Sequence, residues 1–239
     1  MSRLTKPRFL LAYLFAAYFF AVASTTETRV RWGLPLVLLG ALLRLWANGY
    51  VGHVKVNWTQ KWRNDPKIGQ LITAGPYAFV RHPLYLGSLL IGLGFCIAAA
   101  PLGLTVAALG CFVVVYRRKI IQEEALLLDE QGDAYQRYQQ VVPRYLPTWR
   151  RYAQPQGQWS WQGILASKEL KTLMWVLVVM IALYFREELI QEREGLFQKH
   201  RLQRLLLLGL MVALMVSDGL MELVRRRRAK RLMMPGQPT

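Results

Sequence analysis

The apolar residues of this chain are gathered into long blocks, which charged and turn-forming segments separate. Hydrophobic residues make up 54% of its 239 residues. Blocks that approach the ~20 residues of a membrane span favour transmembrane helices over a soluble core. The sequence therefore predicts an all-α integral membrane protein with about six transmembrane helices. The predicted spans are roughly Phe9–Ala23, Leu34–Ala47, Leu84–Ala100, Leu102–Tyr116, Leu170–Phe185 and Leu202–Met221.

The first apolar block also has the features of a secretory signal peptide. Arg3, Lys6 and Arg8 would form its basic region, and residues 21–23 resemble a cleavage site. Two tyrosines interrupt the apolar stretch, however, and they favour a helix that is retained. We therefore expect this block to be the first transmembrane helix.

The net charge of +17 is distributed unevenly along the chain. Of the 31 lysines and arginines, 22 lie in four segments that the predicted spans place on one side, and 7 lie in two segments on the other. Because loops rich in Lys and Arg stay in the cytosol, we expect both termini inside, in a multi-pass protein of a bacterial inner membrane. The cytosolic segments are residues 1–8, 48–82, 117–169 and 222–239, and the opposite ones are 24–31 and 186–204.

The basic tail at residues 225–231 is typical of a flank that touches anionic lipid. We therefore predict membrane lipids, and no nucleic acid, as partners of this surface. Cys96 and Cys111 lie inside predicted spans, where they are small core residues, and no His, Cys and Glu cluster has the spacing of metal ligands.

Three parts follow from these features. Residues 1–47 form a transmembrane hairpin, and residues 48–152 form a core of two spans with polar cytosolic segments. Residues 153–239 comprise a linker, a second hairpin and the basic tail. Within the core, small residues recur along the third and fourth spans, and such spacing predicts that these two helices approach closely. The small residues are Gly87, Gly94 and Ala98 in the third span and Gly103, Ala107 and Gly110 in the fourth.

A first polar cluster lies at the start of the third span. Gly75-Pro76 is a turn, and Pro76 suits the first position of a short helix. Pro83 suits the first position of the span itself and biases His82 toward an extended backbone. An interfacial cap made of aromatic and basic side chains would have the same composition. An Arg-His pair at a membrane surface is nevertheless costly, and this favours a functional site.

A second polar cluster follows the fourth span and contains Arg117, Arg118, Lys119, Glu123 and Glu124. Lys119 and Glu123 are four residues apart and share a helix face. An exposed ion pair of this kind contributes little by itself. The two clusters bracket an apolar hairpin, however, and the hairpin brings them together at one face of the membrane. We therefore predict a site formed by both clusters.

The combined pattern resembles the isoprenylcysteine carboxyl methyltransferase family. Membrane phospholipid methyltransferases have the same core as this family. Residues 75–87 read Gly-Pro-Tyr-x-x-x-Arg-His-Pro-x-Tyr-x-Gly. Residues 123–147 read Glu-Glu-x(7)-Gly-x-x-Tyr-x-x-Tyr-x-x-x-Val-Pro-Arg-x-x-Pro. The resemblance covers residues 69–147 and leaves the flanking spans outside.

The resemblance implies S-adenosylmethionine as methyl donor, held in a pocket at the cytosolic face. A carboxylate suits the ammonium of the donor, and ring N–H or O–H groups suit its carboxylate. The residues implied in cofactor binding are Gln70, Leu71, Ile72, Tyr77, His82, Pro83, Leu84, Tyr85 and Glu123, with Glu124 beside them.

The chain departs from the family pattern one turn before Glu123. Family members that methylate a prenylcysteine carboxylate tend to have arginine there, whereas this chain has Lys119, with Arg118 beside it. Lysine neutralises a carboxylate but does not clamp it with two parallel hydrogen bonds. We expect Lys119, Arg118 and Arg144 to be the catalytic residues that meet the reactive head of the acceptor. The departure at Lys119 leaves open whether this acceptor is a carboxylate, an amine or a hydroxyl.

The sequence predicts an integral membrane methyltransferase that acts on a lipophilic small molecule or a lipid. Two alternatives remain open. A sterol-type membrane reductase that binds NADPH has a similar Arg-His-Pro-x-Tyr-x-Gly region, but usually has asparagine where this chain has Leu84. A non-catalytic membrane scaffold would use residues 153–239 as its working part.

Overall fold

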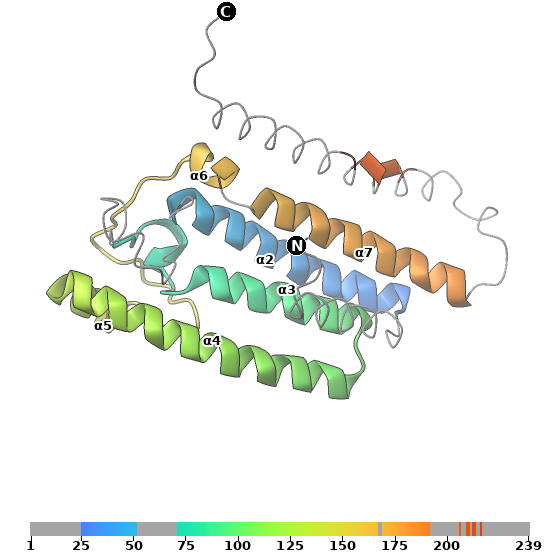
Figure 1. Ribbon diagram of the computed structural model, residues 1–239, viewed down its shortest axis with the longest axis horizontal. Coiled ribbons are helices and arrows are strands. Elements are labelled where there is room, and N and C mark those ends of the chain that lie inside the picture. The colour runs from blue at the N-terminus through green and yellow to red at the C-terminus, as the bar shows by residue number, and fades with distance from the viewer. Residues whose placement is uncertain are drawn as a thin grey trace, which may run out of the picture. The chain divides into compact units, whose positions relative to one another are not determined.

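A computed structural model describes residues 25–51, 71–166 and 169–191, with six isolated positions between 206 and 216. All regular structure in these ranges is helical (Figure 1), which confirms the predicted all-α class. The chain divides into two compact units, Met1–Leu170 and Lys171–Thr239. The described elements are α2 (Glu27–Val51), the 3-10 helix η3 (Gly75–Ala78), α3 (Pro83–Ala99), α4 (Leu102–Gln131), α5 (Asp133–Val141), α6 (Trp161–Ala166) and α7 (Glu169–Gln191).

Four of the six predicted spans fall on described helices. Leu34–Ala47 lies in α2, Leu84–Ala100 matches α3, Leu102–Tyr116 begins α4, and Leu170–Phe185 lies in α7. Phe9–Ala23 lies outside the described residues, as does most of Leu202–Met221. Among the described helices, Thr28–Val51 is the segment whose length and composition suit a membrane crossing, and the apolar helix Pro83–Ala99 is shorter.

Helices α2 and α3 lie side by side and are the most closely packed pair among the described helices (Figure 1). A Cβ atom added to Gly94 would lie 2.6 Å from the carbonyl oxygen of Gly33. One added to Gly87 would lie 2.8 Å from the carbonyl oxygen of Gly40. The two backbones therefore touch at two levels, seven residues apart on each helix, as small residues permit.

The predicted close approach between the third and fourth spans is wrong. Gly87 and Gly94 face α2, while Cβ atoms added to Gly103 and Gly110 on α4 would have nothing within 4 Å. Gly33 and Gly40 of α2 have the same spacing as Gly87 and Gly94 of α3, so spacing alone did not identify the partner helix.

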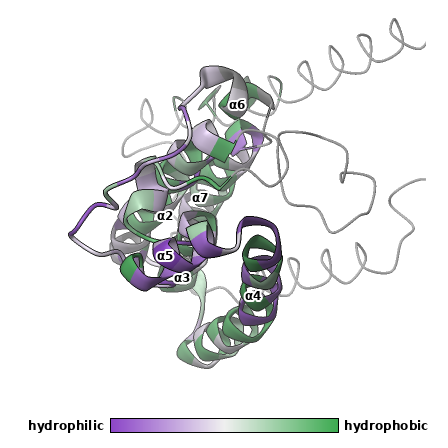
Figure 2. Ribbon diagram, turned by 90° about the vertical axis from the view of Figure 1, so that its left-hand side faces the viewer, coloured by the Kyte–Doolittle hydropathy of each residue, from purple (hydrophilic) through white to green (hydrophobic). Residues whose placement is uncertain are grey.

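Helix α4 is one continuous rod of 30 residues. Its first half exposes apolar side chains such as Leu102, Val106 and Val113, and its second half mixes charged and apolar residues (Figure 2). Gly132 ends the helix with a φ of 48°, a left-handed conformation that glycine adopts without strain. Because no break separates the two halves, the carboxylates of Glu123 and Glu124 are fixed rigidly to the apolar part of the same helix.

An extended loop runs along the segment that carries η3. The amide of Arg81 donates to the carbonyl of Pro143 at 2.9 Å, and the amide of Thr148 donates to the carbonyl of Phe79 at 2.9 Å. Further along, the amide of Thr73 donates to the carbonyl of Gln156 at 3.0 Å. These backbone hydrogen bonds hold residues 73–81 in place from one side, and part of the predicted linker takes part in them.

Candidate active site

The start of α3 follows from its sequence. Pro83 occupies the first turn of the helix, and His82 precedes it with a φ of −124°. The backbone amides of Tyr85 and Leu86 both donate to the carbonyl of His82, which closes the first turn. The imidazole of His82 and the phenol ring of Tyr85 therefore stack one turn apart, with ring centroids 5.7 Å from each other.

The carboxylate of Glu124 is the centre of a buried charge cluster. His82 Nε2 lies 3.0 Å from Glu124 Oε1, and the guanidinium of Arg81 lies 2.9 Å from the same oxygen. Arg144 donates to both carboxylate oxygens, at 3.1 Å and 2.5 Å. Only 7% of Glu124 is exposed. Three basic side chains from two distant segments thus converge on one carboxylate, and the predicted meeting of the two polar clusters is confirmed.

The surroundings of Glu124 keep it ionised. Burial by itself would raise its pKa, but hydrogen bonds from His82 and Arg144 and the charge of Arg81 lower the pKa to about 2. In return, the carboxylate of Glu124 raises the pKa of Arg144. An ionised carboxylate only accepts hydrogen bonds, so the N–H at His82 Nε2 donates the hydrogen bond and Glu124 accepts it. The Nδ1 atom of His82 then faces the second glutamate, Glu123, at 3.9 Å from Oε2.

The neighbouring carboxylate, Glu123, has a different environment. It accepts a hydrogen bond from the hydroxyl of Tyr85, and 23% of its side chain is exposed. A carboxylate has about four lone-pair sites, so Glu123 retains acceptor capacity beyond this bond. Of the two adjacent glutamates, Glu124 is satisfied inside the protein and Glu123 is open to a ligand.

Tyr77 of η3 is influenced by charged groups from two helices. Its backbone carbonyl accepts a hydrogen bond from the hydroxyl of Tyr138 at 2.7 Å. Burial of its hydroxyl raises its pKa above the ordinary value, and the nearby groups Tyr138 and Glu123 raise it further, while Arg44 lowers it. The phenol of Tyr77 is therefore close enough to feel the charges of both Glu123 on α4 and Arg44 on α2.

An aromatic series leads from the carboxylates along the apolar half of α4. The ring of Tyr85 meets that of Tyr116 edge-on, with centroids 4.8 Å apart. Tyr116 in turn stacks on Phe112 at 4.0 Å. This series connects the polar site to the part of α4 that exposes apolar side chains.

The structure places the other predicted site residues as follows. Leu71 is buried in a cluster with Tyr135, Tyr138 and Val142, and Ile72 is half-buried. Pro83 is fully buried at the start of α3, and the carbonyl of Leu84 faces α2. Arg118 and Lys119 are exposed on α4, and Gln70 lies outside the described residues.

Two basic residues were missed as site residues. Arg81 belongs to the Arg-His pair that indicated the site, and its contact with Glu124 shows that the arginine has a part of its own. Arg44 lies in the apolar stretch of α2, and an arginine inside a predicted span is itself a signal of function.

Arg44 forms a second charge cluster of the first unit. Its guanidinium donates to both carboxylate oxygens of Glu169, at 2.8 Å and 2.7 Å. It also donates to the carbonyl of Leu84 at 3.1 Å and to the hydroxyl of Ser88 at 2.5 Å. This side chain therefore ties the first turn of α3 to the residue with which α7 begins.

The fold and the site together define a helical protein in which apolar helices carry a paired-carboxylate site at the end of a hairpin. Residues 33–129 match the model of the isoprenylcysteine carboxyl methyltransferase (ICMT) family. The matched range contains α2 from Gly33 onward, η3, α3 and both glutamates, but ends before Arg144. The resemblance predicted from the sequence is therefore confirmed over this part of the chain.

Two curated relatives are similar to the chain. The protein-S-isoprenylcysteine O-methyltransferase of Schizosaccharomyces pombe is 31% identical over 144 residues, which cover 59% of this chain and 54% of the relative. The cobalt-zinc-cadmium resistance protein CzcN of Cupriavidus metallidurans is 28% identical over 130 residues, which cover 54% of this chain and 56% of the relative. The chain thus spans about half the length of the curated relatives it matches. No solved structure matches it significantly.

Proposed function

We propose that this protein is an integral membrane methyltransferase that uses S-adenosylmethionine and acts on a lipophilic acceptor at the cytosolic face of the membrane. One observation carries the proposal. The open carboxylate of Glu123 lies beside the saturated carboxylate of Glu124, within the range that matches the ICMT family. The likeness to an enzyme named for isoprenylcysteine supports a lipidated acceptor.

The residues present fit the cofactor by their chemistry. S-adenosylmethionine carries an ammonium and a sulfonium, and Glu123 offers a partly exposed carboxylate for the ammonium. Tyr77 and Ile72 offer partly exposed side chains for the less polar part. Leu71 would contribute through its backbone, because its side chain is part of the buried cluster. When bound, the cofactor supplies an electrophilic methyl group.

Glu124 has a positioning role in this proposal. It is held by Arg81, His82 and Arg144, so it fixes the start of α3 and the loop after α5 relative to α4. Its contact with His82 Nε2 also orients the imidazole, as a carboxylate partner does for histidines in other sites. Rigid support of this kind keeps reacting groups aligned, and alignment contributes a large share of rate enhancement.

The acceptor's head group would meet the basic side chains. Arg144 keeps part of its guanidinium exposed while it holds Glu124, with 38% of the side chain accessible. Arg118 and Lys119 lie exposed on the same stretch of α4 as the carboxylates. An anionic head would be attracted by these charges, and a carboxylate nucleophile needs no general base.

Calorimetry with S-adenosylhomocysteine tests the proposal. Glu123→Gln should weaken binding by roughly ten- to a hundredfold, because a charge-assisted hydrogen bond contributes about 1.5–3 kcal/mol. Asp129→Asn, which changes an exposed carboxylate on the same helix, is the matched control and should leave affinity unchanged. Equal affinity of wild type and Glu123→Gln, or no binding to either, would contradict the proposal.

A further inference from the structure

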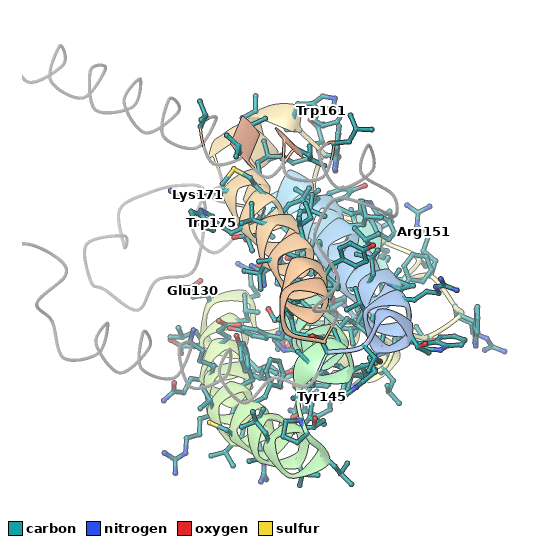
Figure 3. All side chains as sticks on the ribbon, turned by 90° about the vertical axis from the view of Figure 1, so that its right-hand side faces the viewer. Glu130, Tyr145, Arg151, Trp161, Lys171 and Trp175 are labelled. Carbon is teal, nitrogen blue, oxygen red and sulfur yellow. The ribbon has the colours of Figure 1, made fainter. Side chains whose placement is uncertain are left out.

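A cavity of about 470 Å³ lies at the carboxyl-terminal end of α2, apart from the glutamates. The described residues around it are four aromatic and three aliphatic ones. They are Leu45, Trp46, Tyr50, Trp159, Trp161, Ile164 and Leu170. The volume falls in the range of small-molecule sites, and the seven side chains carry no charge. Figure 3 labels Trp161, the first residue of α6.

The cavity is built by specific contacts. The amide of Ser160 donates to the carbonyl of Gly49 at 2.9 Å, which fixes the loop before α6 to the last turns of α2. Gly49 has no side chain, and a Cβ atom there would lie 2.8 Å from Cε2 of Trp159. Trp159 therefore lies directly on the backbone of α2, and Trp161 meets it edge-on with ring centroids 4.7 Å apart.

One wall of the cavity is shared with the candidate active site. The ring of Tyr50 covers Gly75, the first residue of η3, and a Cβ atom there would lie 2.6 Å from Cζ of Tyr50. Gly75 has a φ of 62°, so both its conformation and its lack of a side chain are needed at this contact. Tyr77 follows two residues later, and its phenol is near Glu123. The cavity and the site thus lie on two sides of one short segment.

The charge next to the cavity is neutralised. Glu169 precedes the lining residue Leu170, but both its carboxylate oxygens are bound by Arg44. Aromatic ring faces attract a quaternary ammonium, and an available carboxylate would strengthen that attraction. None of the described residues that line the cavity carries a charge, and the net charge of the chain is +17, so the aromatic and aliphatic walls suit an uncharged hydrocarbon group.

We propose that this cavity, called here the aromatic pocket, binds the hydrocarbon chain of the methyl acceptor and directs its reactive head past Tyr50 toward η3. The inference rests on the proposed function, which it deepens. Residues 159–170 lie outside the range that matches the family model, so this wall of the pocket is not part of the matched core. The pocket would therefore determine which hydrocarbon chains an acceptor can carry.

Calorimetry on the full chain in nanodiscs tests this proposal, with N-acetyl-S-farnesylcysteine as the apolar probe and N-acetylcysteine as its counterpart without the chain. Empty nanodiscs are the blank. Trp161→Ala removes a pocket wall that is 68% exposed, so the fold should tolerate it, and we expect about tenfold weaker binding of the farnesylated probe. Trp149→Ala is the matched control, because Trp149 is fully exposed and does not line the pocket.

A second pair of variants fills the pocket instead of opening it. Ile164→Trp should block the farnesylated probe, whereas Leu165→Trp, on the exposed side of the same short helix, should not. If the farnesylated probe bound the protein no better than it binds empty nanodiscs, the aromatic residues would be a membrane-anchoring belt only. If the pocket preferred a probe with a choline head group to the farnesylated probe, it would be a cation cage. Either result would overturn the proposal. Binding of S-adenosylhomocysteine, measured in parallel, reports on the proposed function independently of the pocket.

Discussion

Glu123 and Glu124 are neighbours in sequence, yet their positions on α4 give them different physical tasks. Glu124 points into the protein and receives hydrogen bonds or charge from three basic side chains. A buried carboxylate needs such partners, because desolvation of an unpaired charge is costly. Glu123 points toward Tyr85 and remains partly exposed. The sequence shows only two adjacent glutamates. The helix geometry turns Glu124 toward the buried basic side chains and leaves Glu123 available to a ligand.

The depressed pKa of Glu124 makes the stability of the protein acid-sensitive. Its folded pKa of about 2 lies below the ordinary 4.5, so its contribution is complete above pH 4.5 and is lost as the pH falls toward 2. We expect the wild type to lose on the order of 3 kcal/mol of folding stability over this interval. Denaturant unfolding in detergent between pH 6 and pH 2.5 measures the loss.

Glu124→Gln should remove most of this acid dependence. The variant should be less stable than the wild type at neutral pH, by about 3–5 kcal/mol, because Arg81 and Arg144 lose their counter-charge. Glu130→Gln makes the same chemical change at an exposed position of α4 and should behave like the wild type. If both variants kept the wild-type acid profile, Glu124 would not be its cause.

At the scale of the elements, α2 and α3 form a rigid pair that presents η3 and the start of α3 to the carboxylates of α4. The pair is held by backbone contact at Gly33 with Gly94 and at Gly40 with Gly87. Arg44 adds a polar connection between α2 and the first turn of α3 through the carbonyl of Leu84. Helix α4 approaches α3 less closely, and side-chain contacts hold it near the site: the charge cluster around Glu124 and the contacts of Tyr85 with Glu123 and Tyr116.

Two glycine substitutions separate packing from helix propensity. Gly94→Ala places a methyl group against the backbone of α2 and should destabilise the protein by about 1–3 kcal/mol. Gly110→Ala gains the same helix propensity on α4, but has open space around it, and should be neutral or stabilising by about 0.5–1 kcal/mol. Thermal unfolding in a mild detergent compares them. Equal effects would refute the backbone contact between α2 and α3.

At the scale of the whole molecule, the sequence predicted what local patterns control. The helices, the proline-led start of α3 and the stop at Gly132 follow from residue preferences within one turn. The meeting of His82 and Tyr85 with the glutamates follows from the hairpin between them. The ion pair of Arg44 with Glu169 joins residues 125 positions apart. The hydrogen bond from the amide of Thr73 to the carbonyl of Gln156 involves backbone groups alone. Arg44 alone stood out as an arginine inside a predicted span, but no local pattern identified Glu169 as its partner or Gln156 as the partner of Thr73.

The orientation of the molecule in a membrane is the largest consequence of its charge distribution. The proposal places the segment after Tyr116, which contains both glutamates and α5, in the cytosol, because the four segments that the predicted spans put on that side together hold 22 of the 31 lysines and arginines. Residues 24–31, at the start of α2, should lie on the opposite side. The active site would then face the compartment in which S-adenosylmethionine is made and used.

Cysteine accessibility in intact cells tests this orientation. Cys96 and Cys111 are first replaced by alanine, which removes the native thiols. A cysteine at the exposed position Gln136 of α5 should react with a membrane-impermeant maleimide only after the cells are permeabilised. A cysteine at the exposed position Thr26, before α2, should react in intact cells and serves as the matched control. Labelling of Gln136→Cys from outside intact cells would invert the topology and exclude a cytosolic active site, because α4 and α5 carry that position together with Glu123.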